Sequence, residues 1–146
     1  MRSRENWSTK INREELLTLA KEMMAKAYAP YSHFTVGAAL LTEDGRVFTG
    51  CNVENASYPA GICAERTAMS KAVSEGSRKF TAIAIVGGPE GLIHGITAPC
   101  GICRQVMMEF ADPERFEILL SPDGERIESH TLKELLPLGF GPSSLT

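Results

Sequence analysis

The sequence predicts an α/β protein, a three-layer α/β/α sandwich built around a mixed five-stranded sheet. Short β-prone runs alternate along the chain with segments whose apolar residues recur at helical spacing. Two of these runs, Phe80–Val86 and Phe116–Leu120, are almost continuously apolar, which is typical of strands covered on both faces. This alternation predicts one largely parallel sheet whose strands are connected by crossover helices on its faces. An antiparallel hairpin is expected at the start of the sheet. With 146 residues, 43% of them hydrophobic, the chain is expected to form a single domain over residues 1–146.

A helix is predicted near the start of the chain, from Asn12 to Ala27. Leucine, methionine and alanine residues recur there at helical spacing. Asn12 is a suitable N-cap, and Glu15, three residues later, completes a capping box. Pro30 ends the helix. The polar N-terminal residues, 1–11, are expected to be loosely ordered.

Two β-prone runs, Phe34–Leu41 and Val47–Val53, follow the first helix. An Asp-Gly pair lies in the turn between them, which predicts a β-hairpin. A turn-rich loop, 54–61, then leads to a second stretch with helical spacing, Cys63–Ser74, which is closed by Gly76. The hairpin and this helix therefore precede the first of the two apolar strands.

The second half of the chain repeats the alternation of strand and helix. After the first apolar strand and a loop rich in Gly and Pro, Gly101–Phe110 has the spacing of a third helix and precedes the second apolar strand. Arg126–Ser129 is expected to be a short edge strand. Thr131 and Glu134 form a capping box for a brief last helix that ends before Pro137.

Charge and hydropathy exclude several kinds of partner. The chain has 15 Lys and Arg against 18 Asp and Glu, a net charge of −3, so it lacks the basic footprint that nucleic acids or anionic membranes require. No apolar run approaches the roughly 20 residues of a membrane span, and the polar start leads into no signal-peptide core. We expect a cytoplasmic protein without nucleic-acid or membrane partners. In that reducing compartment, four cysteines indicate metal binding or catalysis before disulfides.

Three of the cysteines are predicted to form a zinc site. Cys63, Cys100 and Cys103 fall at the starts of two predicted helices, where the helix dipole favours the thiolate that binds metal. Ligands of open α/β sheets gather at this edge, beyond the carboxyl ends of the strands. Three thiolates suit Zn²⁺ and leave its fourth position open, as in catalytic sites. Glu65 can then move a proton from water to a substrate.

Cys51 leaves an alternative open. It lies in a predicted strand without a CxxC partner, so packing explains it better than ligation. If it completed a site of four thiolates, the zinc would be structural, and the chain would be a module that binds protein or nucleic acid.

Two motifs carry a family resemblance. Cys63-Ala64-Glu65-Arg66, followed by Pro99-Cys100-Gly101-Ile102-Cys103-Arg104-Gln105, resembles the signature of the zinc cytidine deaminases of the small homotetrameric type. The likeness extends to AYAPYSHFTVGAALL at 27–41, NVENASY at 52–58, LLP at 135–137 and FGP at 140–142. The resemblance implies a cytidine deaminase-like fold and one Zn²⁺ per chain. It also implies that the three cysteines are the ligands and that Glu65 is the general acid/base.

The same resemblance assigns contacts with a nucleoside substrate. It implies that the backbone of Ala64 meets the pyrimidine edge, that Phe34 stacks on the ring, and that Asn52 and Glu54 hydrogen-bond the sugar hydroxyls. Two further residues of the substrate loop are implied to contact the substrate, Ala56 and Tyr58.

Arg66 and Phe140 complete the implied site. Arg66 donates to the thiolates, which carry a net negative charge together with Zn²⁺ and would otherwise raise the pKa of the attacking water. Phe140 aligns with an aromatic residue that reaches a neighbouring subunit's site, so the resemblance implies a homotetramer with shared active sites.

The implied reaction is the zinc-dependent hydrolytic deamination of cytidine and deoxycytidine to uridine and deoxyuridine, with release of ammonia, in pyrimidine salvage. A similar deaminase that inactivates a cytosine-nucleoside antibiotic ranks below this, because it lacks the Asn-x-Glu pair that Asn52 and Glu54 supply here. A polynucleotide or tRNA deaminase should carry a basic channel for strand phosphates, and the net charge of −3 disfavours it.

Overall fold

The computed structural model describes residue 7 and residues 10–146. The segment predicted to be loosely ordered, residues 1–11, therefore lies mostly outside the described residues. Among the residues that are described, no helix is long and apolar enough to cross a membrane.

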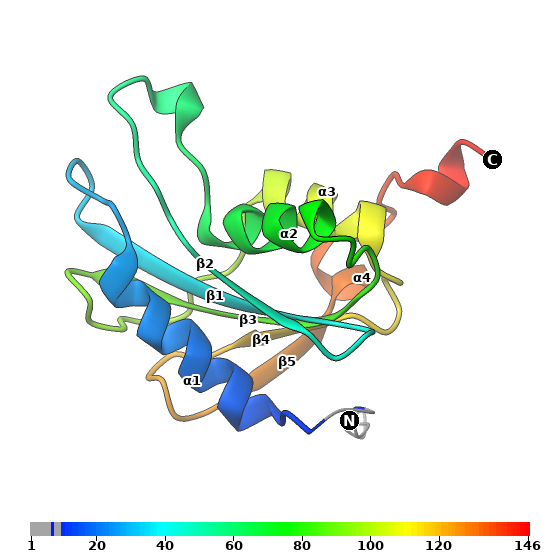
Figure 1. Ribbon diagram of the computed structural model, residues 1–146, viewed down its shortest axis with the longest axis horizontal. Coiled ribbons are helices and arrows are strands. Elements are labelled where there is room, and N and C mark those ends of the chain that lie inside the picture. The colour runs from blue at the N-terminus through cyan, green and yellow to red at the C-terminus, as the bar shows by residue number, and fades with distance from the viewer. Residues whose placement is uncertain (1–6, 8–9) are drawn as a thin grey trace.

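The centre of the fold is a five-stranded sheet with the order β2-β1-β3-β4-β5 (Figure 1). Its strands are β1 (Phe34–Thr42), β2 (Val47–Cys51), β3 (Phe80–Pro89), β4 (Glu117–Leu120) and β5 (Glu128–Thr131). Strand β3 lies in the middle and is buried from Ala82 to Gly88, as its continuous apolar run predicted. The predicted mixed sheet of five strands is confirmed.

The expectation that this sheet is largely parallel is wrong. Strand β1 is antiparallel to both β2 and β3, and β5 is antiparallel to β4, so β3 and β4 are the one parallel pair. The predicted strand–helix–strand crossovers do exist. Helix α3 (Gly101–Phe110) connects the paired parallel strands β3 and β4, whereas β2 and β3 run in the same direction but are not paired, because β1 lies between them.

Helices cover both faces of the sheet and complete the three layers (Figure 1). Helix α1 (Arg13–Met23) lies on one face, and α2 (Ala64–Ser74), α3 (Gly101–Phe110) and α4 (Leu132–Leu135) lie on the other. Both predicted capping boxes are present, at the starts of α1 and α4. The first helix ends at Met23, and a 3₁₀ turn, Met24–Lys26, fills the rest of its predicted span.

Strand β5 begins two residues later than Arg126–Ser129 predicts. The Asp123 side chain accepts hydrogen bonds from the backbone N–H groups of Glu125 and Arg126. These amides are therefore held in a turn and cannot join the strand.

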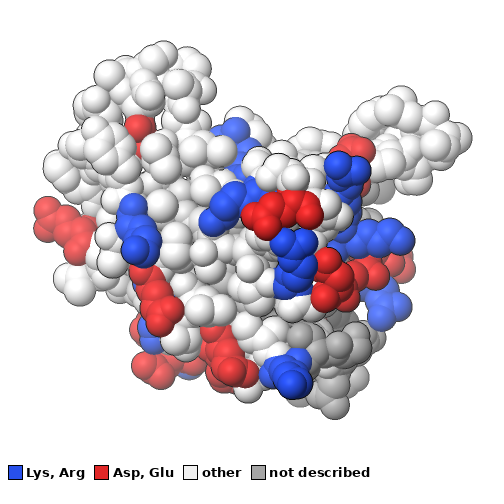
Figure 2. Space-filling model, in the orientation of Figure 1, with Lys and Arg blue, Asp and Glu red and all other residues white. Residues whose placement is uncertain are grey.

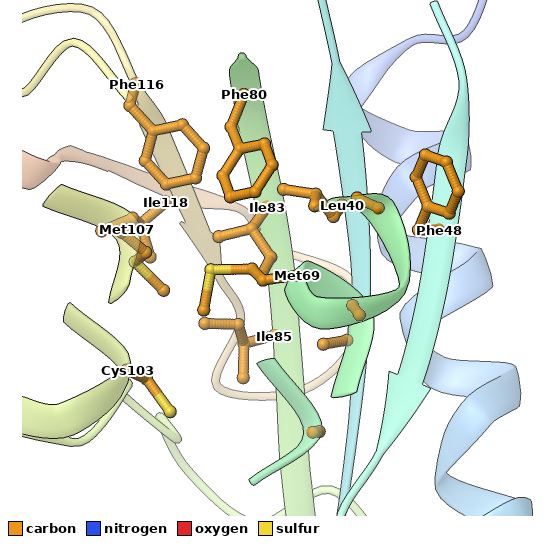
Figure 3. Close-up of a cluster of buried hydrophobic side chains, with 14 of the residues drawn as sticks. Leu40, Phe48, Met69, Phe80, Ile83, Ile85, Cys103, Met107, Phe116 and Ile118 are labelled. Carbon is orange, nitrogen blue, oxygen red and sulfur yellow. The ribbon is translucent and has the colours of Figure 1, made fainter. Parts of the chain in front are cut away.

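Two hydrophobic cores follow from the alternation of side chains along the strands. Ala38 and Leu40 of β1 face the core beneath α2 and α3, whereas Ala39 and Leu41 face the core beneath α1. Cys103 is fully buried and belongs to the first of these cores (Figure 3). One of the three predicted metal ligands is thus held in the packed interior.

Gly50 allows helix α2 to lie close against the sheet. A Cβ atom at this position of β2 would lie 2.4 Å from the backbone oxygen of Ala64, in the first turn of α2. A contact this short with backbone atoms cannot be relieved without moving the helix, so glycine sets the distance between the hairpin and the start of α2.

Candidate active site

The starts of helices α2 and α3 bring three cysteines together. Cys63 is the N-cap residue of α2 and Cys100 that of α3, while Cys103 lies in the first turn of α3. Neither N-cap side chain makes a capping hydrogen bond, so both sulfur atoms are available to a ligand. The helix dipoles add positive potential at this position, which favours thiolates.

The spacing of the sulfur atoms fits a zinc ion. The Sγ atoms of Cys63 and Cys100 are 3.7 Å apart, those of Cys100 and Cys103 are 3.5 Å apart, and all three lie within 4.8 Å of one another. Thiolates bound tetrahedrally to zinc at about 2.3 Å lie about 3.8 Å apart. The three side chains can therefore hold Zn²⁺ with little rearrangement.

The fourth cysteine does not join this cluster. The Sγ of Cys51 contacts the backbone oxygen of Lys26 at 3.3 Å, and the metal-competent group found among the described residues contains the other three cysteines alone. The packing explanation for Cys51 is therefore the one that the structure supports, and the alternative of a four-thiolate structural site has no support here.

The charges around the sulfur atoms favour ionisation of Cys63. A hydrogen bond from the thiol of Cys103 and the neighbouring Arg66 guanidinium outweigh burial and lower the pKa of Cys63 to about 5. The same hydrogen bond raises the pKa of Cys103. The Nη2 of Arg66 lies 3.7 Å from the Sγ of Cys63, where its charge compensates that of a thiolate.

Glu65 is a buried carboxyl group beside the cysteines. It lies in the first turn of α2 and is only 4% exposed. Burial raises its pKa to about 7, and the nearby charge of Cys63 adds to the rise. A carboxyl group with a pKa near neutrality can both accept and donate a proton under physiological conditions, as a general acid/base must.

A cavity of about 570 Å³ connects this cluster with the end of the hairpin. Cys63, Glu65 and Cys100 line one part of it, and Asn52 and Glu54 line another. Its volume lies within the range typical of sites for small molecules. Lys and Arg are absent from the described residues that line it.

The end of the cavity away from the sulfur atoms is organised by Asn52 and Glu54. The Asn52 side chain accepts from the backbone N–H of Val36 at 2.9 Å and donates to the backbone oxygen of Phe34 at 2.8 Å. Glu54 accepts from the backbone N–H groups of Tyr31 and Ser32 and from the Ser32 hydroxyl. Hydrogen bonds from Ser32 hold the pKa of Glu54 below its usual value, so the carboxylate stays charged.

Comparison with known proteins identifies this arrangement. The family described as "Cytidine and deoxycytidylate deaminase zinc-binding region" matches residues 10–118, which contain the cysteine cluster, Glu65, Asn52 and Glu54. The chain belongs to this deaminase family. A cytidine deaminase of Sporosarcina psychrophila is 46% identical over 133 residues, which cover 91% of this chain and 94% of the relative. A probable cytidine deaminase of Dictyostelium discoideum is 46% identical over 139 residues, 92% of this chain and 90% of the relative.

Solved structures of other cytidine deaminases share the fold. The crystal structure from Burkholderia pseudomallei has a TM-score of 0.80 and 48% identity, and covers 89% of this chain and 100% of that one. The structure from Mycobacterium tuberculosis has a TM-score of 0.76 and 40% identity, with 90% and 99% coverage. The cytidine deaminase-like fold and the Zn²⁺ cofactor expected from the sequence are confirmed.

Most of the predicted substrate residues meet in the cavity of this deaminase. Those that line it, besides the metal cluster, are Asn52, Glu54, Tyr58, Ala64 and Glu65. Phe34, Ala56 and Phe140 are not among the lining residues. Phe140 lies on the C-terminal segment and is 60% exposed, with its backbone oxygen bound by the side chain of Gln105.

Sequence reasoning assigned no role to Tyr31, Ser32 or Thr97, which also line the cavity. Tyr31 and Ser32 lie within a segment that carries the family resemblance, but spacing along the chain gives no sign of their hydrogen bonds to Glu54, which is more than twenty residues away. The hydroxyl oxygen of Thr97 is buried and has no hydrogen-bond partner among residue 7 and residues 10–146, which the sequence does not signal either.

Proposed function

We propose that this chain catalyses the zinc-dependent hydrolytic deamination of cytidine and deoxycytidine to uridine and deoxyuridine, with release of ammonia. The observation that carries the proposal is the position of Glu65, a buried carboxyl group with a pKa of about 7, beside three cysteines that fit zinc in one cavity. Membership of the deaminase family and the identity of the relatives support the same reaction.

In this proposal, Cys63, Cys100 and Cys103 hold the zinc ion. When bound, zinc acts as a Lewis acid and lowers the pKa of water at its open position. Glu65 takes a proton from the water that adds to C4 of the pyrimidine and delivers it to the ring nitrogen N3. Glu65 then transfers the second proton of that water to the amino group, which leaves as ammonia while C4 becomes a carbonyl carbon.

The other residues of the site bind and orient the nucleoside. The backbone of Ala64 contacts the pyrimidine edge, Arg66 compensates the thiolate charge, and Phe34 stacks on the ring. Two residues of the substrate loop, Ala56 and Tyr58, complete the contacts. These roles rest on the family motifs, and the position of Ala64 and Tyr58 in the cavity lining supports them.

Asn52 and Glu54 already make hydrogen bonds within the protein, and these determine which of their donor and acceptor sites remain to bind the sugar. One oxygen of Glu54 accepts two backbone N–H groups and the other accepts the Ser32 hydroxyl, which leaves one acceptor site of the carboxylate. Asn52 retains one N–H donor and one lone pair of its side-chain oxygen after its bonds to the Phe34 oxygen and the Val36 N–H. The Asn52 donor and the Glu54 acceptor site together suffice to bind a single hydroxyl group, so loss of the other sugar hydroxyl should be tolerated.

We further propose a homotetramer with shared active sites. Two segments with few charged residues, the loop around Tyr58 and the C-terminal segment, project from the same side of the chain (Figures 1 and 2). Tyr58 is 76% exposed, and Leu138, Phe140 and Leu145 on the C-terminal segment are exposed as well. Exposed apolar side chains of this size favour burial against another subunit, and Phe140 would then reach a neighbouring subunit's cavity.

A cytoplasmic location and a role in pyrimidine salvage are part of the same proposal. All four cysteines are free thiols, as a reducing compartment maintains them. The partner is a small nucleoside, because the described residues that line the cavity include no cationic side chain for a nucleotide phosphate or a nucleic-acid strand.

The direct test is an ultraviolet assay of cytidine conversion on the purified protein, with zinc quantified on the same sample. The proposal predicts conversion to uridine, stoichiometric ammonia and one zinc per chain. A zinc-loaded protein that left cytidine unchanged would refute it.

A further inference from the structure

The hydroxyl group of Ser32 lies between the backbone of Phe34, the residue assigned to ring stacking, and the side chain of Glu54, which is assigned to sugar binding. The backbone N–H of Phe34 donates to the Ser32 Oγ at 3.0 Å. The Ser32 hydroxyl in turn donates to one oxygen of Glu54. Because a carboxylate only accepts and a backbone N–H only donates, these two partners fix the direction of the hydroxyl proton toward Glu54.

The backbone around Ser32 is held in place on both sides. His33 adopts a left-handed conformation with φ of 60°, which is unfavourable for a non-glycine residue and persists only where its surroundings impose it. The His33 N–H donates to the oxygen of Ala29, and the His33 oxygen accepts from the N–H of Glu90. The loop therefore presents Ser32 to Glu54 in a defined orientation.

The backbone of Phe34 is hydrogen-bonded to two side chains of the site, those of Ser32 and Asn52. Its N–H is bound by Ser32 and its carbonyl oxygen by the side chain of Asn52. Phe34, the residue at the start of β1 that is assigned to ring stacking, is thus hydrogen-bonded directly to Asn52 and, through the Ser32 hydroxyl, to Glu54. Ser32 is the link between Phe34 and Glu54 in this network.

We propose that Ser32 is a positioning residue for sugar recognition in this enzyme. Its hydroxyl group occupies one acceptor site of Glu54, orients the carboxylate, and leaves a single oxygen lone pair directed at one sugar hydroxyl. The inference rests on the proposed function, because it assumes that Glu54 binds the sugar. Ser32 acts through Glu54 and has no part in the proton transfers at C4.

The test compares Ser32→Ala with the unaltered enzyme on cytidine and on 2′,3′-dideoxycytidine, which lacks both ring hydroxyls of the sugar. We expect KM for cytidine to rise about tenfold, as for the loss of one hydrogen bond to a charged group, with kcat changed by less than about threefold. With the dideoxynucleoside, both enzymes should have the same kcat/KM to within about twofold, because no hydroxyl reaches Glu54.

Two further variants control this test. Ser32→Thr keeps the hydroxyl group and should restore KM for cytidine to within about twofold of the original value. Ser74→Ala removes a serine hydroxyl that also makes a hydrogen bond, to the oxygen of Lys71 at the end of α2, and should leave both substrates unaffected.

The outcomes separate this inference from the proposed function. An equal loss of kcat/KM on both substrates would mean that Ser32 only supports the loop, and an unchanged KM for cytidine would also overturn the inference. Glu54→Gln is measured in the same series. If Glu54→Gln raises KM and Ser32→Ala does not, the inference about Ser32 alone is wrong. If Glu54→Gln leaves KM unchanged, sugar recognition by Glu54 is wrong, and the inference falls with it.

Discussion

The Sγ atoms of Cys63 and Cys100 lie 3.7 Å apart, although 37 positions separate the two residues in the sequence. Each cysteine is the N-cap of a different helix, and the strand β3 lies between those helices along the chain. The metal site therefore joins the first helical turns of α2 and α3.

Removal of a ligand should remove the metal. We expect one zinc per chain in the original protein and its loss in Cys63→Ala, Cys100→Ala and Cys103→Ala, because two thiolates bind zinc far less tightly than three. Metal content by atomic spectroscopy measures this directly. The matched control is Cys51→Ala, which should keep its zinc because its sulfur lies against the oxygen of Lys26. Zinc retained in all three ligand variants would contradict the assignment.

Loss of the acid/base group should abolish turnover without loss of metal. Glu65→Gln keeps the size of the side chain but cannot accept a proton. We expect kcat to fall by about 10⁴-fold or more, at the upper end of the range for acid/base groups, because Glu65 serves in two transfers. Steady-state kinetics and zinc content are measured on the same preparation. Activity within about tenfold of the original enzyme would rule out a direct role.

The buried ion pair of Arg13 and Glu117 should make stability depend on pH. Their side chains are 9% and 6% exposed and joined by hydrogen bonds at 2.5 and 2.8 Å. Burial alone would raise the pKa of Glu117, but hydrogen bonds from Arg13, Trp7 and Ser129 outweigh it and lower the pKa below 4.5. This contribution is therefore complete above about pH 4.5 and is lost as the pH falls through the lowered pKa of the folded state.

Replacement of that carboxylate should be costly. We expect Glu117→Gln to reduce the free energy of unfolding by about 3 kcal/mol at pH 7, measured by guanidinium denaturation at fixed protein concentration. Trp7, the single tryptophan, donates to Glu117, so its fluorescence reports on this cluster. The control is Glu114→Gln, which breaks an exposed ion pair with Lys133 and should cost less than about 1 kcal/mol. Equal effects of the two variants would contradict a special role for the buried pair.

The chain should assemble into a tetramer through its projecting segments. Light scattering at working concentration should give four times the mass of one chain. Phe140→Ala should reduce activity, because it removes the side chain that is expected to reach a neighbouring cavity. A monomer with full activity would exclude shared sites.

The enzyme should require the sugar of a nucleoside and should not accept a phosphate group on it. Cytidine and deoxycytidine should both react, since one hydroxyl satisfies Asn52 and Glu54. Cytosine should be poorer by about 10⁴ in kcat/KM, because polar groups built to bind a hydroxyl are left without it. Cytidine monophosphate should also fail, because Glu54 is anionic and the described lining has no cation for a phosphate. The four compounds are compared side by side, and equal kcat/KM for cytidine and the monophosphate would show that the sugar argument is wrong.

Local patterns predicted the helices and the metal cluster well. The third helix begins and ends at Gly101 and Phe110 as its periodicity indicates, and the capping residues Asn12 and Thr131 make the expected hydrogen bonds. Cys100 and Cys103 could be paired from their local spacing. Cys63 could be added to them because it also lies at a predicted helix start and precedes Glu65, which are again local signals.

Features that depend on distant partners were not predictable in the same way. The insertion of β1 between β2 and β3 is decided by pairing between residues about 40 to 55 positions apart, and apolar runs do not encode strand direction. The bonds of Ser32 to Glu54 arise because a loop and a strand end meet in space. Phe140 is not among the residues that line the cavity, so the role proposed for it would depend on a contact between subunits, which patterns within one chain do not specify.

The placement of β1 between β2 and β3 affects how the protein acquires its metal. The pairing of residues 37 to 41 with residues 82 to 86 brings together the segments that follow β2 and β3, so the complete set of three sulfur atoms depends on long-range contacts. An unfolded chain presents only the Cys100–Cys103 pair at close range. Zinc should therefore bind the assembled chain far more tightly than any precursor, and zinc availability should shift the folding equilibrium by mass action. In a cell, metal supply would then influence the abundance of this enzyme as well as its turnover.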